Sequence, residues 1–215
     1  MIFVIFTILV KTVDVVYYYN NTYVGFYTLN SKFGAFVTDF GKYEAMSKIS
    51  DIILYSSFAY IAILFVFAII EAVKLKSLFK INKNYFLVLG GYIAVVFVYL
   101  IFEIVKVNYS PGSVAGELKA SYPSSHVFLG CMFYLLNSYT ALKLLKPEKE
   151  WIGDLVYGGT TVICLLLVFT RAMSAKHWLT DIIASIILVS AIYTLFIGIH
   201  HKLVLEAPKM QKEVE

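Results

Sequence analysis

The strongest constraint on the fold is a series of long apolar runs that contain no charged side chain. Residues 52–70, 85–102 and 182–199 form three such runs, and each is close to the roughly 20 residues that an α-helix needs to cross a bilayer. Two further runs, 124–142 and 152–170, contain one ionisable residue each, His126 and Asp154. Runs of this length predict transmembrane helices.

The composition agrees with this interpretation. The chain is 60% apolar and 15% charged, whereas a soluble domain is about half apolar and about a quarter charged. The apolar start, which Lys11 and Asp14 interrupt, is interpreted as a first span and not as a removed signal peptide. We therefore predict an all-α, polytopic membrane protein with a single domain of six transmembrane helices. The predicted spans are approximately 1–19, 52–70, 85–106, 124–145, 152–173 and 177–200, and a loop with an interfacial helix is expected within 20–50.

Several other features predict ordinary structural roles. No cluster of basic residues is interleaved with aromatic ones, so nucleic acid is not an expected partner. Cys131 and Cys164 lie in apolar runs without metal-ligand spacing, so they are expected to pack, and no metal site is predicted. Interfacial or span-end positions without a chemical role are expected for Asp51, Glu71, Asp154, His200, His201 and the tyrosines at 17–19. The sequence gives no indication of the oligomeric state.

The distribution of lysines predicts the orientation of the bundle. Four lysines lie in the connection 71–84, three in 143–150 and three after His200. The positive-inside rule makes these segments cytoplasmic. The connections that contain Ser113 and Arg171 then lie together on the outer side.

One cluster of chemically suggestive residues lies at the start of the last predicted span. His177 and Asp181 are four residues apart, so they share a helix face if the helix includes both. A carboxylate there fixes the imidazole tautomer and leaves the other nitrogen as a nucleophile. Arg171, the single arginine in the chain, precedes them, and its planar guanidinium suits phosphate oxygens better than an ammonium does.

A second cluster lies at the start of the fourth predicted span. Pro123 suits the first turn of a helix, which leaves the amides of Ser124 and Ser125 free at its N-terminus. Free amides, two hydroxyls and the helix dipole together predict an anion site. His126 lies one step further along and is placed to act as a general acid.

Each of these residues also has a purely structural explanation. His126 can be an interfacial histidine, Arg171 a membrane anchor at a span end, and His177 with Asp181 a polar pair between helices. The functional interpretation is preferred because all of them are predicted to meet on one face.

The two clusters resemble motifs of the type 2 phosphatidic acid phosphatase family. The family sequence Ser-Arg, five residues, His, three residues, Asp is matched by Thr170, Arg171, His177 and Asp181. The family sequence Pro-Ser-Gly-His is matched by Pro123, Ser124, Ser125 and His126. Residues 24–30 are similar to a Gram-positive branch of the family. The resemblance covers the chain from about Tyr85 to Ile199.

The family's first motif, Lys, six residues, Arg-Pro, is degenerate here. Glu103 stands in place of the lysine, and Ser110 stands in place of the arginine before Pro111. Two phosphate-binding cations are therefore missing. Lys106, expected on the helix close to Glu103, is the preferred substitute, and Lys119 is the second choice.

The resemblance implies an enzyme that hydrolyses phosphate monoesters or pyrophosphates of lipids without a cofactor or metal. His177 would attack phosphorus, Asp181 would orient it, and His126 would protonate the leaving group, while Arg171, Ser124, Ser125 and Lys106 would bind phosphate. Phosphatidic acid, phosphatidylglycerophosphate and polyprenyl pyrophosphate are the implied substrates, at the outer face of a bacterial cytoplasmic membrane. The alternative is a catalytically impaired relative that binds lipid headgroups or a partner protein.

Overall fold

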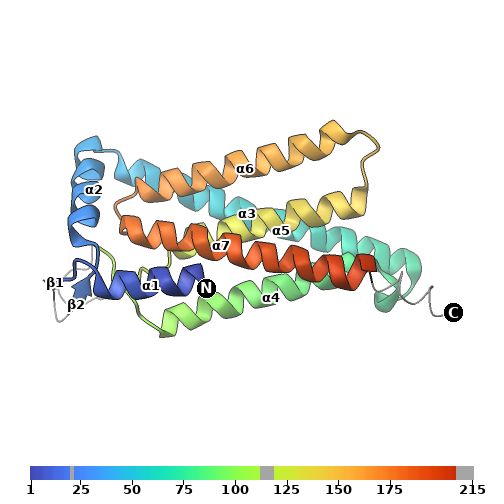
Figure 1. Cartoon of the computed structure of the whole chain (residues 1–215). Helices are drawn as coiled ribbons and strands as arrows, with labels where there is room; N and C mark the ends of the chain where they lie inside the picture. Colours follow the sequence, from blue (N-terminus) through green and yellow to red (C-terminus); the bar gives the residue numbers. More distant parts are fainter. Residues whose placement is uncertain (20–21, 112–118, 207–215) are drawn as a thin grey trace.

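Five long helices form the body of the molecule in the computed structural model, which describes residues 1–19, 22–111 and 119–206 (Figure 1). By length and composition, these five are the described helices able to cross a membrane. They are α3 (Tyr43–Leu75), α4 (Lys83–Ile104), α5 (Ser125–Leu145), α6 (Glu150–Ala172) and α7 (Leu179–His200). The chain is therefore a multi-pass, all-helical membrane protein apart from one small hairpin.

The helix α5 lies at the centre of the bundle and contacts α3, α4, α6 and α7. In its most apolar window 72% of the residues are buried, against 11–33% in the other four helices. Its mean hydropathy is the lowest of the five, 1.3 against 1.9–2.5. A helix that contacts protein instead of lipid can contain polar side chains if they find hydrogen-bond partners. Ser138 of α5, for example, pairs with Thr160 of α6 at 2.6 Å.

The first predicted span is wrong in its extent. The helix α1 (Ile2–Thr12) has 11 residues, which amount to about 16 Å, or roughly half of a bilayer core. Asp14 adopts a left-handed backbone conformation with φ of 46°, and the chain continues as a hairpin of β1 (Val16–Tyr19) and β2 (Thr22–Val24). The described residues thus contain five full-length candidate spans and one short apolar helix, and the structure does not confirm a sixth span.

The helix expected between the first two spans is present as α2 (Tyr27–Phe40), which lies across one end of the bundle (Figure 1). Gly25 allows α2 to follow α1 closely, because a Cβ atom at this position would lie 1.8 Å from the carbonyl oxygen of Val10. Asn30 of α2 is buried and bonds to Thr180 in the first turn of α7. The helix α2 is therefore attached to the end of the bundle that contains the start of α7.

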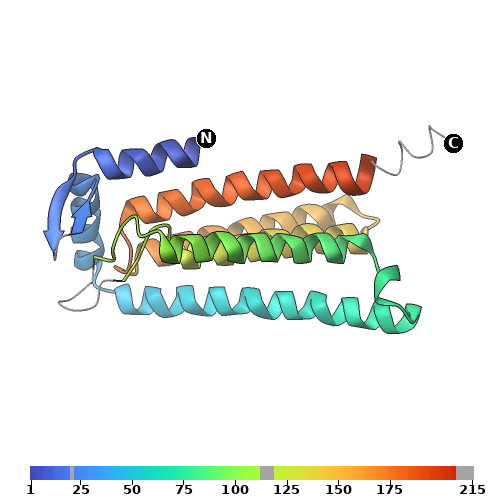
Figure 2. The ribbon, with the colours of Figure 1, turned by 90° about the horizontal axis from the view of Figure 1, so that it is seen from below.

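The connections alternate between the two ends of the bundle, as the predicted order of the spans requires. The η1 turn (Leu78–Lys80) between α3 and α4, the α5–α6 connection and the end of α7 share one end, while the α4–α5 and α6–α7 connections share the other (Figures 1 and 2). A π-helical segment, η2 (His201–Glu206), follows α7. His200 is not an exposed interfacial residue as expected: it is buried between Tyr139 and Asn84, at 2.9 and 2.7 Å.

Candidate active site

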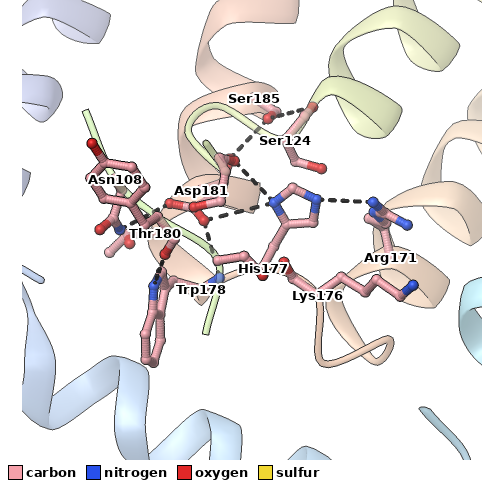
Figure 3. Close-up of polar contacts among 12 residues, drawn as sticks. Asn108, Ser124, Arg171, Lys176, His177, Trp178, Thr180, Asp181 and Ser185 are labelled. Atoms are coloured by element: carbon pink, nitrogen blue, oxygen red, sulfur yellow. Dashed lines mark hydrogen bonds and ion pairs between the residues drawn. The ribbon is translucent and has the colours of Figure 1, made fainter. Parts of the chain in front are cut away.

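The predicted catalytic residues converge at the end of the bundle that α2 covers. His177 lies in the short connection between α6 and α7, and Asp181 lies in the first turn of α7 (Figure 3). The prediction that the two residues share a helix face is wrong, because His177 precedes the helix. The His177 Nδ1 atom nevertheless lies 3.7 Å from Asp181 Oδ2, because Trp178 caps the helix between them and turns the chain.

The Asp181 carboxylate is fully buried and held by two donors. The backbone amide of Trp178 donates to Oδ2 at 3.1 Å, and Asn108 Nδ2 donates to Oδ1 at 3.2 Å. A buried carboxylate remains ionised only when such donors replace water. Asn108 lies in the connection that follows α4 and was not identified from the sequence, because single asparagines in loops are common.

His177 is held as one tautomer. Its Nδ1 atom lies 3.0 Å from the carbonyl oxygen of Ser121, and a carbonyl oxygen only accepts hydrogen bonds, so Nδ1 carries the proton. The Nε2 lone pair then accepts from Arg171 NH2 at 3.1 Å (Figure 3). Burial lowers the pKa of His177, and the nearby Arg171 lowers it further, against the opposing effect of Asp181. His177 is therefore neutral near pH 7 with its unprotonated Nε2 atom beside a cation.

Arg171 lies in the last turn of α6 with only 8% of its side chain exposed. Besides His177, its guanidinium faces Asp51, with 3.8 Å between NH1 and Oδ1. Its Nε atom has no hydrogen-bond partner among the described residues. A buried donor without a partner is costly, so this arginine has capacity for a further acceptor.

The start of α5 supplies further donors. Ser124 is the N-cap, and the first α-helical backbone bond of α5 runs from Phe128 to Ser124, so the amides of Ser125 to Val127 precede the helical ladder. The amide of Ser124 was expected to be free, but it donates to the carbonyl oxygen of Asp181 at 3.2 Å. The Ser124 hydroxyl is buried, has no described partner, and points toward the His177 ring in Figure 3.

His126 has a carboxylate partner, Asp51, for which the sequence predicted no chemical role. Its Nε2 atom lies 2.8 Å from Asp51 Oδ1. The prediction that Asp51 lies at a span boundary is wrong, because α3 begins at Tyr43 and not near residue 52. Charged residues in the first turns of α3 interrupt the apolar run, although the helix continues through them.

Contrary to the prediction from the sequence, the substitute cation Lys106 is not on a helix. The helix α4 ends at Ile104, so Lys106 follows the helix instead of lying on it, and its side chain is exposed. No hydrogen bond or ion pair joins Lys106 to another described residue. Ser110, at the missing arginine position, donates from its hydroxyl to the carbonyl oxygen of Lys176 at 3.0 Å. Ser113 lies outside the described residues.

A cavity of about 350 Å³ opens between α2 and the α6–α7 connection. His177 forms part of its wall, together with Asn30, Phe33 and Val37 of α2 and Trp178 at the start of α7. The cavity therefore has an apolar side and borders His177, whereas Arg171, Ser124 and His126 are not part of its lining. Within the described part of the chain, no group of three or more His, Cys, Asp or Glu side chains is arranged to hold a metal ion.

Taken together, the helical bundle and the site define a multi-pass membrane protein with a buried histidine, arginine and aspartate cluster at one end. The fold is similar to that of a transmembrane PAP2-type phosphatidylglycerolphosphate phosphatase from Bacillus subtilis, known from a crystal structure, with a TM-score of 0.60. The similarity covers 95% of this chain and 94% of that chain at 16% sequence identity. Neither the sequence models of protein families nor the curated proteins gave a match.

Proposed function

We propose that this protein is a membrane-embedded phosphatase that hydrolyses phosphate monoesters or pyrophosphates of lipids through a phosphohistidine intermediate. The observation that carries the proposal is the state of His177. Its Nδ1 proton is engaged by the Ser121 carbonyl group, and its Nε2 lone pair faces Arg171 at 3.1 Å. A nucleophile beside a guanidinium suits a phosphorus atom whose oxygens that guanidinium binds.

The reaction requires two displacement steps. His177 Nε2 attacks phosphorus, the bond from phosphorus to the leaving oxygen breaks, and that oxygen receives a proton from His126. A water molecule then attacks the phosphohistidine with His126 as the base, the phosphorus–nitrogen bond breaks, and inorganic phosphate leaves. Asp181 stabilises the positive charge that develops on the His177 ring during the first step.

The donors around this position support phosphate binding. The Nε atom of Arg171 and the hydroxyl of Ser124 lack partners among the described residues. The first amides of α5, including that of Ser125, lie at the positive end of a helix dipole. We propose these groups as the ligands of the phosphoryl oxygens, and we retain Lys106 as a cation that contributes only if the connection after α4 rearranges.

The membrane context and the cavity support a lipid as the substrate. The PAP2-type neighbour acts on phosphatidylglycerolphosphate according to its description, so this lipid, phosphatidic acid and polyprenyl pyrophosphate are the substrates to be compared first. We further propose that the site end faces the outside of a bacterial cytoplasmic membrane, because the opposite end has its lysines in short connections.

Two observations favour a second function. Asp51 occupies a position between His126 and Arg171, and no lysine or arginine stands at the first-motif positions Glu103 and Ser110. A relative that binds lipid headgroups or a protein partner without turnover would have such a site.

Release of inorganic phosphate by the purified protein from a panel of lipid phosphates in detergent distinguishes the two functions. We expect turnover of at least one lipid, its loss in His177→Ala, and retention of a phosphoenzyme in His126→Ala with a good leaving group. The activity should also persist in excess EDTA. Full activity of His177→Ala would exclude the mechanism, and absence of turnover on every lipid would favour the binding function.

A further inference from the structure

A single oxygen atom of Asp51 lies near both groups that are expected to act on phosphate. Asp51 Oδ1 is 2.8 Å from His126 Nε2 and 3.8 Å from Arg171 NH1. Arg171 in turn contacts the nucleophilic nitrogen of His177. A phosphate oxygen that contacts His126 Nε2 and Arg171 NH1 at once would therefore compete with Asp51 Oδ1 for the same region of the site.

The negative charges of the site affect how well a phosphate group can compete with Asp51. Arg171 is the only arginine in the chain, and its charge faces the Asp51 carboxylate on one side. Asp181 adds a second, buried carboxylate close to His177. A phosphate monoester brings up to two negative charges, because its second pKa is about 6. Like charges in a confined site repel strongly, so a doubly charged ligand is poorly matched to the site while Asp51 is ionised.

Asp51 also has room to move. Its side chain is 38% exposed, compared with 23% for His126 and 8% for Arg171. It has two side-chain torsions and lies in the third turn of α3, so it can rotate away without a change in the backbone. The cost of the rotation is the loss of its contacts with His126 and Arg171.

Resting on the proposed function, we propose that Asp51 is a specificity-determining residue that disfavours the doubly charged form of a phosphate monoester relative to its singly charged form. Its carboxylate lies beside the two groups proposed to act on phosphate, and a ligand that contacts both must displace it. A singly charged phosphate group competes with the carboxylate at lower electrostatic cost than a doubly charged one.

Binding of two small probes tests this proposal without turnover. Methyl phosphate is doubly charged at pH 8, whereas dimethyl phosphate is singly charged and differs from it by one methyl group. Dissociation constants are measured by the ligand-dependent shift in the melting temperature of the detergent-solubilised protein. Asp51→Asn, which keeps the shape of the side chain, should bind methyl phosphate about tenfold more tightly than the wild type. Its affinity for dimethyl phosphate should change by less than about threefold.

Glu44→Gln is the matched control. Glu44 is exposed in the first turn of the same helix. The substitution removes the same charge from the same end of the molecule, so it should leave both dissociation constants unchanged. Asp51→Ser, a second neutral variant, should repeat the result of Asp51→Asn if the latter folds poorly.

Equal or weaker binding of methyl phosphate in the neutral Asp51 variants would overturn the proposal. So would an absence of measurable binding to wild type and variants alike. A fall in kcat with unchanged probe affinity would also overturn it, because Asp51 would then only position His126. Failure of the protein to hydrolyse any lipid phosphate would count against the proposed function, yet the contrast between the two probes would still decide the role of Asp51.

Discussion

At the scale of single residues, the two histidines of the site differ in the groups that hold them. His177 is held by a backbone carbonyl group and a fully buried carboxylate, whereas His126 contacts a carboxylate that is partly exposed. A ring held by fixed, buried groups keeps one tautomer and orientation. The ring of His126 can exchange its partner when a ligand arrives.

The motif spacing was sufficient to predict that the residues of the second and third motifs lie at one end of the bundle, but it predicted neither the position of Lys106 nor what holds the two histidines. His126, Arg171, His177 and Asp181 could be found because their spacing places them at one end of the bundle. Asp51 and Asn108 could not be found in this way, because each comes from a separate segment and reaches the site only through tertiary packing. The sequence pattern carries no information about which side chain of a long helix faces inward near its end.

The Asp181 carboxylate has an effect on His177 whose sign can be tested. Burial lowers the pKa of His177 below its ordinary value of 6.5, and the nearby Asp181 carboxylate opposes this shift. In Asp181→Asn the imidazolium loses that support, so the pKa of His177 should fall further. The acid limb of kcat/KM should then move to lower pH, while kcat falls by about two to four orders of magnitude.

This prediction is checked with pH profiles of phosphate release for the wild type and Asp181→Asn. Asp154→Asn, at the opposite end of the bundle, is the control and should leave the profile in place. An acid limb that moves to higher pH in Asp181→Asn would contradict the assignment.

At the scale of elements, the apolar runs predict the positions of α4 to α7. They do not predict where α1 ends or where α3 begins. The expected first span failed because the helix ends at Thr12, after which Val13 adopts an extended conformation. The helix α3 is longer than predicted, with 33 residues, or about 50 Å, so its polar first turns lie beyond a bilayer core of about 30 Å. Hydropathy identifies the lipid-facing part of a helix, but it does not identify the turns of the same helix that extend into protein or water.

The contact between α2 and α7 depends on one buried side chain. Asn30 Nδ2 donates to the Gly25 carbonyl oxygen at 2.9 Å and to Thr180 Oγ1 at 3.1 Å, and Asn30 Oδ1 accepts from the Thr180 amide at 3.2 Å. That amide belongs to the first turn of α7 and has no helical partner. Asn30→Ala should therefore destabilise the protein by about 1–3 kcal/mol.

The measurement is the melting temperature in detergent, which should fall by several degrees in Asn30→Ala. Ser31→Ala is the control, because the hydroxyl of the neighbouring Ser31 makes a local bond with the carbonyl oxygen of Thr28. Similar melting temperatures for the two variants would show that Asn30 does not hold α2 against α7.

At the scale of the whole molecule, the bundle has two chemically different ends. The end with the site is covered by α2 and the hairpin, whereas the other end has short connections with lysines (Figure 2). The lysine density predicts that the site end faces outside. In a background with both native cysteines replaced by alanine, Lys42→Cys at the site end and Lys149→Cys at the opposite end test this orientation, since both lysines are exposed.

An impermeant thiol reagent should label Lys42→Cys in intact cells and Lys149→Cys only after permeabilisation. The reverse pattern would place the candidate active site on the cytoplasmic side, and would require a substrate that is available in the inner leaflet.

The low hydropathy of α5 has a consequence for how the chain enters the membrane. Insertion of a single helix depends on its own transfer from water to lipid, and by this measure α5 has the weakest tendency of the five long helices. The helices α3 and α4 precede it in the chain and both contact it in the final bundle. We therefore expect α5 to be retained in the bilayer only once these two have been inserted, so that the helix with the proposed anion site is the one whose membrane integration depends most on its neighbours.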